Sequence, residues 1–418
     1  MFIMKIIKTF GFFTLIAALT VFSCSTDTPA DNDDDDDDSS LIVIEEKPTI
    51  LDDAEYLLES QPPAQTLADL FTAALPAQLS NTWKIYGHKN PLWTGNFGAD
   101  PNILIYNDRL YVYTSNDTLE YTAEGQLATS TYQYGIQGIR IVSSSDLVNW
   151  TDHGPVNIVG PANTNPLIED KYWQQLLSIP GVERSWAPTA AWKVINRKPM
   201  FFLYWGNGGD GVGVVTSNTP VGPWTAPLNK LLVDRDTPTC APVRYLFDPS
   251  VFIDDDGQGY LFFGGGGSGR DVGPEGNARR VKLGGDMISL AADPVKWDVP
   301  WLFEASDMKK LKGVYYFSYS ANSQYTSGGS IVYVRPIDPM SGFGANPNTY
   351  DPPVVLTTAG VQLGSSDTNT HHAMFEFRGE TYMIYHTQKV AEAMGVGRMR
   401  SPSIDRMPIN ANGTIDPV

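Results

Sequence analysis

The segment FDPSVFIDDDGQGYLFFGG, Phe247–Gly265, carries a pattern that recurs along the chain. An acidic residue is followed by a short apolar run, by a turn rich in Asp and Gly, and by a second run rich in Tyr and Phe. Two such runs around a turn of this composition predict a β-hairpin. The same order of features begins again at four other positions, namely Asp100, Ala187, Glu304 and His371.

These five hairpins predict an all-β fold, a five-bladed β-propeller. They recur about every 55 to 90 residues with little helical periodicity between them, and small antiparallel sheets repeated in this way arrange radially. Equivalent residues on the innermost strands then point to one axis. The five equivalents are expected to be Asp100, Ala187, Asp248, Glu304 and His371. Burying unpaired acids is costly, so their convergence indicates a functional site.

The first 80 residues are expected to lie outside the propeller. Residues 1–23 combine two Lys with an apolar run too short for a membrane span, which predicts a secretory signal peptide. Cys24 follows directly, as the acylated Cys does in bacterial lipoproteins; an ordinary signal peptide with an incidental Cys is the alternative. Residues 24–47 predict a disordered acidic tether, residues 48–80 a short helical spacer, and residues 81–418 the catalytic propeller.

Charge and cysteine content limit the partners. The net charge is −18 at pH 7, and acidic residues still outnumber basic ones after the acidic tether. Without a basic stripe for phosphate backbones, the sequence argues against nucleic acid as a partner. If Cys24 carries lipid, Cys240 has no disulfide partner and is expected to be a lone loop or buried thiol. A closed propeller needs no partner subunit, so a monomer is expected.

Three axial carboxylates suit the hydrolysis of a glycosidic bond. One carboxylic acid protonates the leaving oxygen and one carboxylate activates water, while a third charge nearby raises the pKa of the acid. Aromatic side chains near the opening residues are expected to stack on sugar rings, with core packing as the alternative. They are Trp93, Phe97, Trp186, Phe247 and Trp301.

Three segments with motif-like composition are interpreted as structural. Gly206–Val215 resembles a dinucleotide-binding loop but lacks the helix that follows such a loop. Gly264–Gly267 lacks the Lys of a phosphate loop and predicts a flexible rim. Asp254–Gly257 lacks the closing Glu of a calcium loop and predicts a hairpin turn. The Trp that ends each outer hairpin, Trp150 or Trp224, is expected to pack in the core.

Five phrases together resemble glycoside hydrolase family 43, whose members are five-bladed propellers acting on arabinose- and xylose-containing polysaccharides. The phrases are GADPNILIYNDRLYVYTSND, SWAPTAAW, FDPSVFIDDDGQGYLFFG, FEASDMKKLKGVYYFSYSA and HHAMFEFRGETYMIYH, from about Trp83 to Val418. The resemblance implies that Asp100 is the general base, Asp248 the modulator that raises the pKa of the acid and orients it, and Glu304 the general acid. It also implies inversion, and with it a separation of ~6.5–9.5 Å between the carboxyl groups of Asp100 and Glu304.

The resemblance also implies a metal and an arginine. His371 matches the axial His beside a central calcium ion in many members, so a structural Ca²⁺ at the propeller axis is expected. A late Arg contacts the modulator in family members; we place Arg398 in the substrate site, although the spacing does not decide between Arg398 and Arg400. Glu304 is followed by Ala rather than Gly-Pro, which favours an exo-acting α-L-arabinofuranosidase, with β-xylosidase and endo-arabinanase as alternatives.

Other functional classes stay open as alternatives. A related propeller clan acts on sucrose and fructans with retention, but Phe247 stands where its motif has Arg. A non-catalytic surface glycan-binding lipoprotein is the alternative outside enzymes, and the presence of all three acids argues against it. The expected partners are a plant cell-wall polysaccharide or oligosaccharide and, through Cys24, a membrane. The acidic run resembles the surface-export signal of Bacteroidetes lipoproteins, so we expect an outer-membrane location at the cell surface, or otherwise in the periplasm.

Overall fold

The computed structural model describes residues 90–92, 97–117, 136, 138–159, 177, 179–266, 276–321, 325, 329–342, 352–357, 369–395 and 399–418. The predicted signal peptide, tether and helical spacer lie outside the described residues, as do Trp93 and Arg398. Among the described residues, no helix is both long and apolar enough to cross a membrane.

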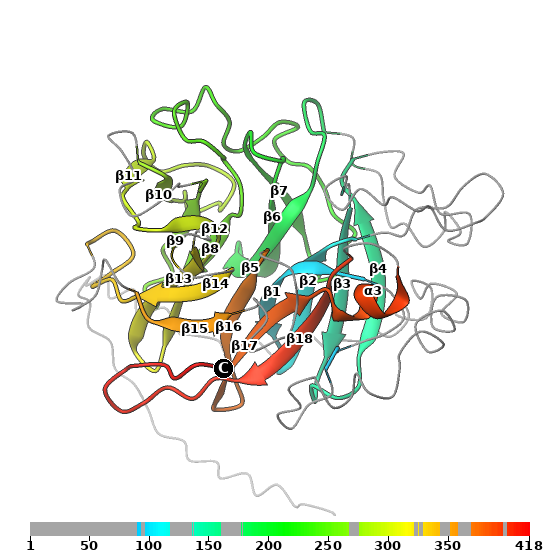
Figure 1. Ribbon diagram of the computed structural model, residues 1–418. Coiled ribbons are helices and arrows are strands. Elements are labelled where there is room, and N and C mark those ends of the chain that lie inside the picture. The colour runs from blue at the N-terminus through cyan, green and yellow to red at the C-terminus, as the bar shows by residue number, and fades with distance from the viewer. Residues whose placement is uncertain are drawn as a thin grey trace, which may run out of the picture. The chain divides into compact units, whose positions relative to one another are not determined.

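Five antiparallel sheets make up the described part of the chain (Figure 1). Each is a meander in which strands consecutive in the chain are hydrogen-bonded neighbours, and one short helix, α3 (Lys389–Met394), lies between two strands of the last sheet. The sheets are β1 (Ala99–Tyr106), β2 (Arg109–Ser115), β3 (Gly138–Ser144) and β4 (Thr151–Asn157); β5 (Trp186–Ile195), β6 (Lys198–Gly206) and β7 (Val212–Ser217); β8 (Ser250–Ile253), β9 (Gly259–Phe263), β10 (Ala278–Lys282) and β11 (Val295–Trp297); β12 (Leu302–Leu311), β13 (Val314–Ala321), β14 (Ser330–Val334) and β15 (Val354–Thr357); and β16 (His372–Phe377), β17 (Glu380–Thr387) and β18 (Ser401–Arg406).

The first strands of the five sheets form a closed ring. β1 contacts β5, β5 contacts β8, β8 contacts β12, β12 contacts β16, and β16 returns to β1. Five sheets that meet through their first strands in this circular order are the blades of a β-propeller. The predicted fold is therefore confirmed.

The hydrophobic core lies between the blades as five separate clusters, one for each pair of neighbouring sheets. Successive residues of one strand belong to different clusters: on β6, Phe201 and Leu203 pack against the first blade, whereas Phe202 and Tyr204 pack against the third. Successive side chains of a strand point to opposite faces of a sheet, so both faces are buried here. This explains why the second strand of each hairpin is a nearly continuous apolar run.

Side chains on the inner strands hold neighbouring blades in register. The backbone N–H of Val251 donates to Oγ1 of Thr189 (3.3 Å), and the N–H of Met308 donates to Oγ of Ser250 (3.0 Å). The N–H of Met374 donates to Oδ2 of Asp307 (2.8 Å). The same bond between successive blades identifies the residues that occupy equivalent places on the inner strands.

This register corrects one predicted equivalence. The donors Val251, Met308 and Met374 lie three residues after Asp248, Ala305 and His371, so Ala305 is the fourth axial residue and Glu304 precedes it by one. The backbone agrees, because Asp100, Ala187, Asp248 and Ala305 all have a left-handed φ, between 44° and 61°. The prediction failed because it aligned the acidic residues themselves, whereas Glu304 stands at the place that Trp186 holds in the second blade, one residue before the axial position.

The remaining structural predictions have mixed outcomes. Gly257 closes the turn after β8 with a φ of 77° and donates its N–H to the carbonyl of Asp254, which confirms the hairpin. Trp224 is a buried core residue, and Cys240 is a buried free thiol, both as expected. The predicted flexible rim is wrong for Gly264–Gly266. A Cβ at Gly265 would stand 2.2 Å from the carbonyl oxygen of Phe303, so this glycine lets two segments approach closely.

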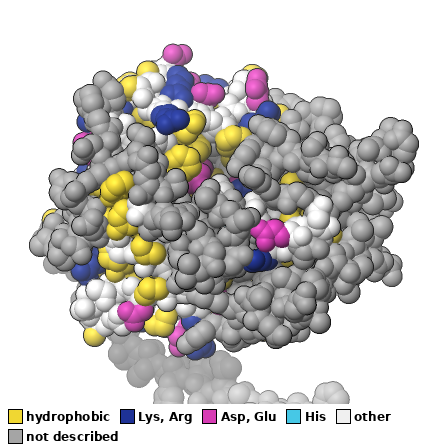
Figure 2. Space-filling view, in the orientation of Figure 1, with side chains coloured by type: hydrophobic (Ala, Val, Ile, Leu, Met, Phe, Trp, Pro, Cys, Tyr) yellow, Lys and Arg dark blue, Asp and Glu magenta, His cyan; other side chains and the backbone are white. Residues whose placement is uncertain are grey.

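Acidic and basic side chains are interspersed on the described surface in Figure 2. Charges of both signs on the face shown argue against a field of one sign there.

Candidate active site

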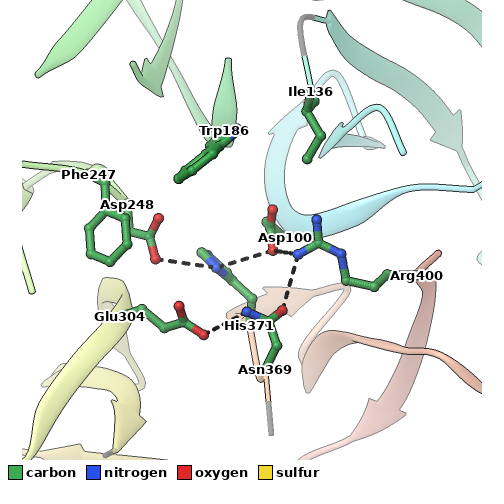
Figure 3. Close-up of a pocket in the computed structure, with 9 residues that line it drawn as sticks. All are labelled: Asp100, Ile136, Trp186, Phe247, Asp248, Glu304, Asn369, His371 and Arg400. Carbon is green, nitrogen blue, oxygen red and sulfur yellow. Dashed lines mark hydrogen bonds and ion pairs between the residues drawn. The ribbon is translucent and has the colours of Figure 1, made fainter. Parts of the chain in front are cut away.

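A pocket opens where the inner strands begin. It is lined by Asp100, Ile136, Trp186, Phe247, Asp248, Glu304, Asn369, His371 and Arg400, which come from all five blades (Figure 3). The three acids predicted from the sequence therefore share one hollow, as radial repetition requires.

Asp100 is a buried carboxylate that is held in the ionised form. Its Oδ1 accepts a hydrogen bond from Nη1 of Arg400 (2.8 Å), and its Oδ2 accepts one from Oγ of Ser115 (2.6 Å). Burial by itself raises the pKa of this carboxyl, but the charge of Arg400, the neighbouring imidazoles and the bond from Ser115 outweigh burial and lower the pKa to about 2. Asp100 is thus a carboxylate at neutral pH.

For Asp248 the surroundings raise the pKa instead of lowering it. Its pKa is raised, first by burial and then by the nearby charge of Asp100, while His371 partly opposes the increase. Its Oδ2 accepts a hydrogen bond from the backbone N–H of Ala305 (2.7 Å). Because Ala305 directly follows Glu304, Asp248 holds the peptide that carries the Glu304 side chain.

Glu304 is buried at the start of β12, with 8% of its surface exposed. Its Oε1 accepts a hydrogen bond from Nδ2 of Asn369 (3.0 Å). Figure 3 shows Glu304 and Asp100 on opposite sides of the His371–Asn369 pair. The carboxyl separation expected for inversion stays a prediction.

Arg400 is fully buried and connects two carboxylates. Its Nε and Nη2 bind the two oxygens of Asp117 at 2.9 and 3.0 Å, while Nη1 contacts Asp100 and Oδ1 of Asn369 (3.1 Å). The backbone N–H of Arg400 also donates to Oδ2 of Asp117 (3.0 Å). A two-point grip of this kind fixes the plane of the guanidinium and so directs its remaining nitrogen at Asp100.

His386 supports the same corner of the pocket as a neutral imidazole. The backbone N–H of Asp100 donates to its Nδ1 (3.0 Å), so Nδ1 carries no proton, and its Nε2 donates to the carbonyl of Asn369 (3.2 Å). Burial and the charge of Arg400 lower the pKa of His386 to about 3, which agrees with this tautomer.

Comparisons with known proteins agree with this geometry. Residues 88–415 match the model of a family described as "Glycosyl hydrolases family 43". The chain belongs to this family. It is 39% identical to an arabinoxylan arabinofuranohydrolase of Paenibacillus polymyxa over 346 residues, which cover 80% of this chain but only 52% of the relative. The chain therefore spans about half the length of that protein.

Two solved family 43 structures are similar to it. One is an arabinoxylan arabinofuranohydrolase from Bacillus subtilis in complex with cellotetraose, with 37% identity, a TM-score of 0.69, and coverage of 82% of this chain and 70% of the other. The second is an α-L-arabinofuranosidase from Clostridium thermocellum, with 36% identity, a TM-score of 0.57, and coverage of 78% and 95%.

The residues around His371 do not form a calcium cage in this family 43 chain. Nδ1 of His371 lies 3.7 Å from Oδ1 of Asp100 and 3.7 Å from Oδ2 of Asp248, so the imidazole lies between two carboxylates. Calcium takes about six to eight oxygen ligands, whereas these two oxygens already accept hydrogen bonds from protein donors. Within the described parts of the chain, no group of three or more His, Cys, Asp or Glu could hold a metal ion. The described residues thus supply no direct cage for calcium, and a calcium ion held beside His371 through waters stays a prediction.

The aromatic residues predicted for the site differ in where they lie. Trp186 and Phe247 line the pocket, but Phe97 does not fit the predicted role because only 1% of its surface is exposed. Its ring is a core ring that cannot stack on a sugar. Trp301 packs against the core between the third and fourth blades and against the ring of Tyr325.

The arginine that reaches the site among the described residues is Arg400, and it binds the predicted base Asp100. Sequence reasoning missed Asn369, Asp117 and His386. Asp117 ends the first quoted phrase and His386 lies within the last, but no spacing rule separates them from neighbouring polar residues.

Proposed function

We propose that this chain is an inverting, exo-acting α-L-arabinofuranosidase that removes arabinose from arabinoxylan-type plant polysaccharides or oligosaccharides. The observation that carries the proposal is the meeting of Asp100, Asp248 and Glu304 in one pocket, with opposite effects of the surroundings on the two Asp pKa values. Pairs of titratable groups whose environments push their pKa values apart are typical of acid–base sites.

In the proposed reaction Glu304 donates a proton to the glycosidic oxygen as the bond from that oxygen to the anomeric carbon breaks. The bonding electrons leave with the oxygen, which departs as an alcohol. Asp100 takes a proton from a water that attacks the anomeric carbon from the opposite face, so the product has inverted configuration.

The surrounding residues position these two groups. Arg400 and Ser115 keep Asp100 ionised and fix its orientation, and Asp248 holds the Glu304–Ala305 peptide through the N–H of Ala305. Trp186 and Phe247 supply apolar faces in the same pocket for a sugar ring. A general acid and a general base are each worth about 10²–10⁴-fold in rate.

The names of the relatives support arabinose as the sugar that is released. The relatives from Paenibacillus polymyxa, Bacillus subtilis and Clostridium thermocellum are all described as arabinofuranohydrolases or arabinofuranosidases. The Ala after Glu304 in place of Gly-Pro points the same way.

The test is product identification with wheat arabinoxylan, linear arabinan, xylo-oligosaccharides and galactan as substrates. We expect free arabinose from arabinoxylan, with the β-anomer appearing first by proton NMR because inversion converts an α-linkage to a β-product. Release of xylose from xylo-oligosaccharides as the main product would favour the β-xylosidase alternative. Binding of these glycans without release of any sugar would contradict the proposed enzymatic activity and favour a glycan-binding lipoprotein.

Calcium is tested separately. Because the donors near His371 do not form a cage, we expect kcat to survive dialysis against EDTA. A loss of activity that is restored by added calcium but not by magnesium would contradict this expectation and support a calcium ion at the propeller axis.

We also propose that Cys24 is lipidated and anchors the protein to the outer membrane at the cell surface. The support is the apolar run that ends before Cys24 and the acidic run after it. In cells fed with radiolabelled palmitate, the native chain is expected to be labelled and protease-accessible from outside, whereas Cys24→Ser is expected to be neither labelled nor membrane-bound. Equal labelling of the two chains would contradict the anchor.

A further inference from the structure

The side-chain amide of Asn369 has a fixed orientation in the pocket. Nη1 of Arg400 lies 3.1 Å from one end of the amide, and a guanidinium can only donate, so that end is the carbonyl oxygen Oδ1. The other end, Nδ2, therefore faces Oε1 of Glu304 at 3.0 Å. Asp117 keeps Arg400 from turning away through its two-point contact.

This orientation distinguishes the two oxygens of Glu304. A carboxylic acid carries its proton on one oxygen, and its carbonyl oxygen is the stronger acceptor, so an N–H that points at Oε1 favours the O–H on Oε2. We propose that Asn369 is a positioning residue that directs the acid proton of Glu304 to Oε2, from which it is delivered to the glycosidic oxygen. The inference rests on the proposed function, because it needs Glu304 as the general acid.

Asn369 also connects the acid to the base. The backbone carbonyl of Asn369 accepts from Nε2 of His386, and Nδ1 of His386 accepts from the backbone N–H of Asp100. Arg400 forms a second connection through side chains, from Asn369 to Asp100. Glu304 and Asp100 are thus held relative to one another by two hydrogen-bonded routes that diverge at Asn369, one through its backbone carbonyl and one through its side chain.

The step assigned to this arrangement balances with water as the further reactant, because the water forms the new bond to the anomeric carbon and gives a proton to Asp100. The proton on Oε2 moves to the leaving oxygen, the bonding pair follows that oxygen, and Glu304 becomes a carboxylate whose Oε1 still accepts from Asn369. An alcohol leaving group needs this proton, whereas a nitrophenolate leaves well without it. Loss of Asn369 should therefore lower kcat more for a basic leaving group than for a weakly basic one.

The experiment compares kcat for arabinoxylan and for 4-nitrophenyl α-L-arabinofuranoside in the full chain and its variants. For Asn369→Ala we expect kcat to fall about 100-fold on arabinoxylan but less than about 5-fold on the nitrophenyl substrate. Asn369→Asp keeps an acceptor for Arg400 and removes the N–H, so it should show the same selectivity even if the Ala variant folds poorly.

Two controls separate the outcomes. Asn277 is a buried amide that donates to the carbonyl of Leu302 on the same strand as Glu304, so Asn277→Ala tests loss of a buried amide away from the acid. It should lower both rates equally or leave both unchanged. Glu304→Ala should be at least as selective as Asn369→Ala. If Glu304→Ala is selective and both Asn369 variants are not, this inference is wrong and the proposed function stands; if Glu304→Ala is not selective, both are wrong.

Discussion

Replacing Arg400 by Met removes the one cation that two buried carboxylates share. Met fills a similar volume, so the change is chiefly electrostatic. In the native protein Arg400 is 2% exposed and binds Asp117 with two nitrogens and Asp100 with a third. After the change, neither carboxylate keeps its cationic partner, while both stay out of water.

The cost should be large at neutral pH and small in acid. Breaking a buried ion pair costs about 3–5 kcal/mol because an uncompensated charge remains buried. The native pKa of Asp100 is about 2, so its contribution to stability is present above its ordinary value of 3.8 and is lost as pH falls towards 2. In the variant, burial acts on both carboxyls without the opposing charge of Arg400, so the pKa of Asp100 and the already raised pKa of Asp117 both increase. The variant is therefore least stable at high pH and recovers as pH falls and the two groups protonate.

Urea unfolding followed by tryptophan fluorescence at pH 7 and at pH 4 measures both effects. We expect Arg400→Met to lose about 3–5 kcal/mol at pH 7 and distinctly less at pH 4. Arg378→Met is the matched control, because Arg378 pairs with Asp108 on the surface with 51% of its side chain exposed, and water screens the pair. A loss for Arg400→Met no larger than that for Arg378→Met, or one that is equal at both pH values, would refute the reasoning.

Three further predictions concern the pocket and the backbone next to it. Asp248→Asn should shift the acid limb of the kcat/KM profile to lower pH. The reason is that Asp248, with its raised pKa, is protonated at a higher pH than Asp100 as the pH falls. If the acid limb does not move, it reports the titration of another group. Gly265→Ala places a methyl against the carbonyl of Phe303 and should lower the unfolding free energy by about 1–3 kcal/mol, whereas Gly285→Ala, which meets no atom within 4 Å, should not. Trp186→Ala should raise KM for arabinoxylan about 2- to 10-fold through loss of an aromatic face. Trp192→Ala on the same strand should leave KM unchanged. Equal effects of the two changes would show that Trp186 does not contact the sugar.

Part of the site could be predicted because radial repetition turns sequence order into spatial proximity. Asp100, Asp248 and Glu304 open repeated hairpins, and hairpins that repeat around an axis bring their opening ends together. The same rule failed by one residue in the fourth blade, where Ala305 occupies the axial place, because the acid of that blade stands one residue earlier and the apolar pattern fits either register. It also failed for Phe97, whose burial depends on what covers it.

The sequence by itself determined the five hairpins, their all-β character and the acids at their openings, since alternation and turn chemistry act between residues close in the chain. Only the tertiary structure decided which side chains serve those acids. Arg400 reaches Asp100 across 300 residues, and Asn369 reaches Glu304 across 65. Such contacts arise when the last blade closes against the first and the fourth. No local sequence pattern predicts that closure, because the residues next to a polar side chain do not reveal whether it contacts water or a residue from the far end of the chain.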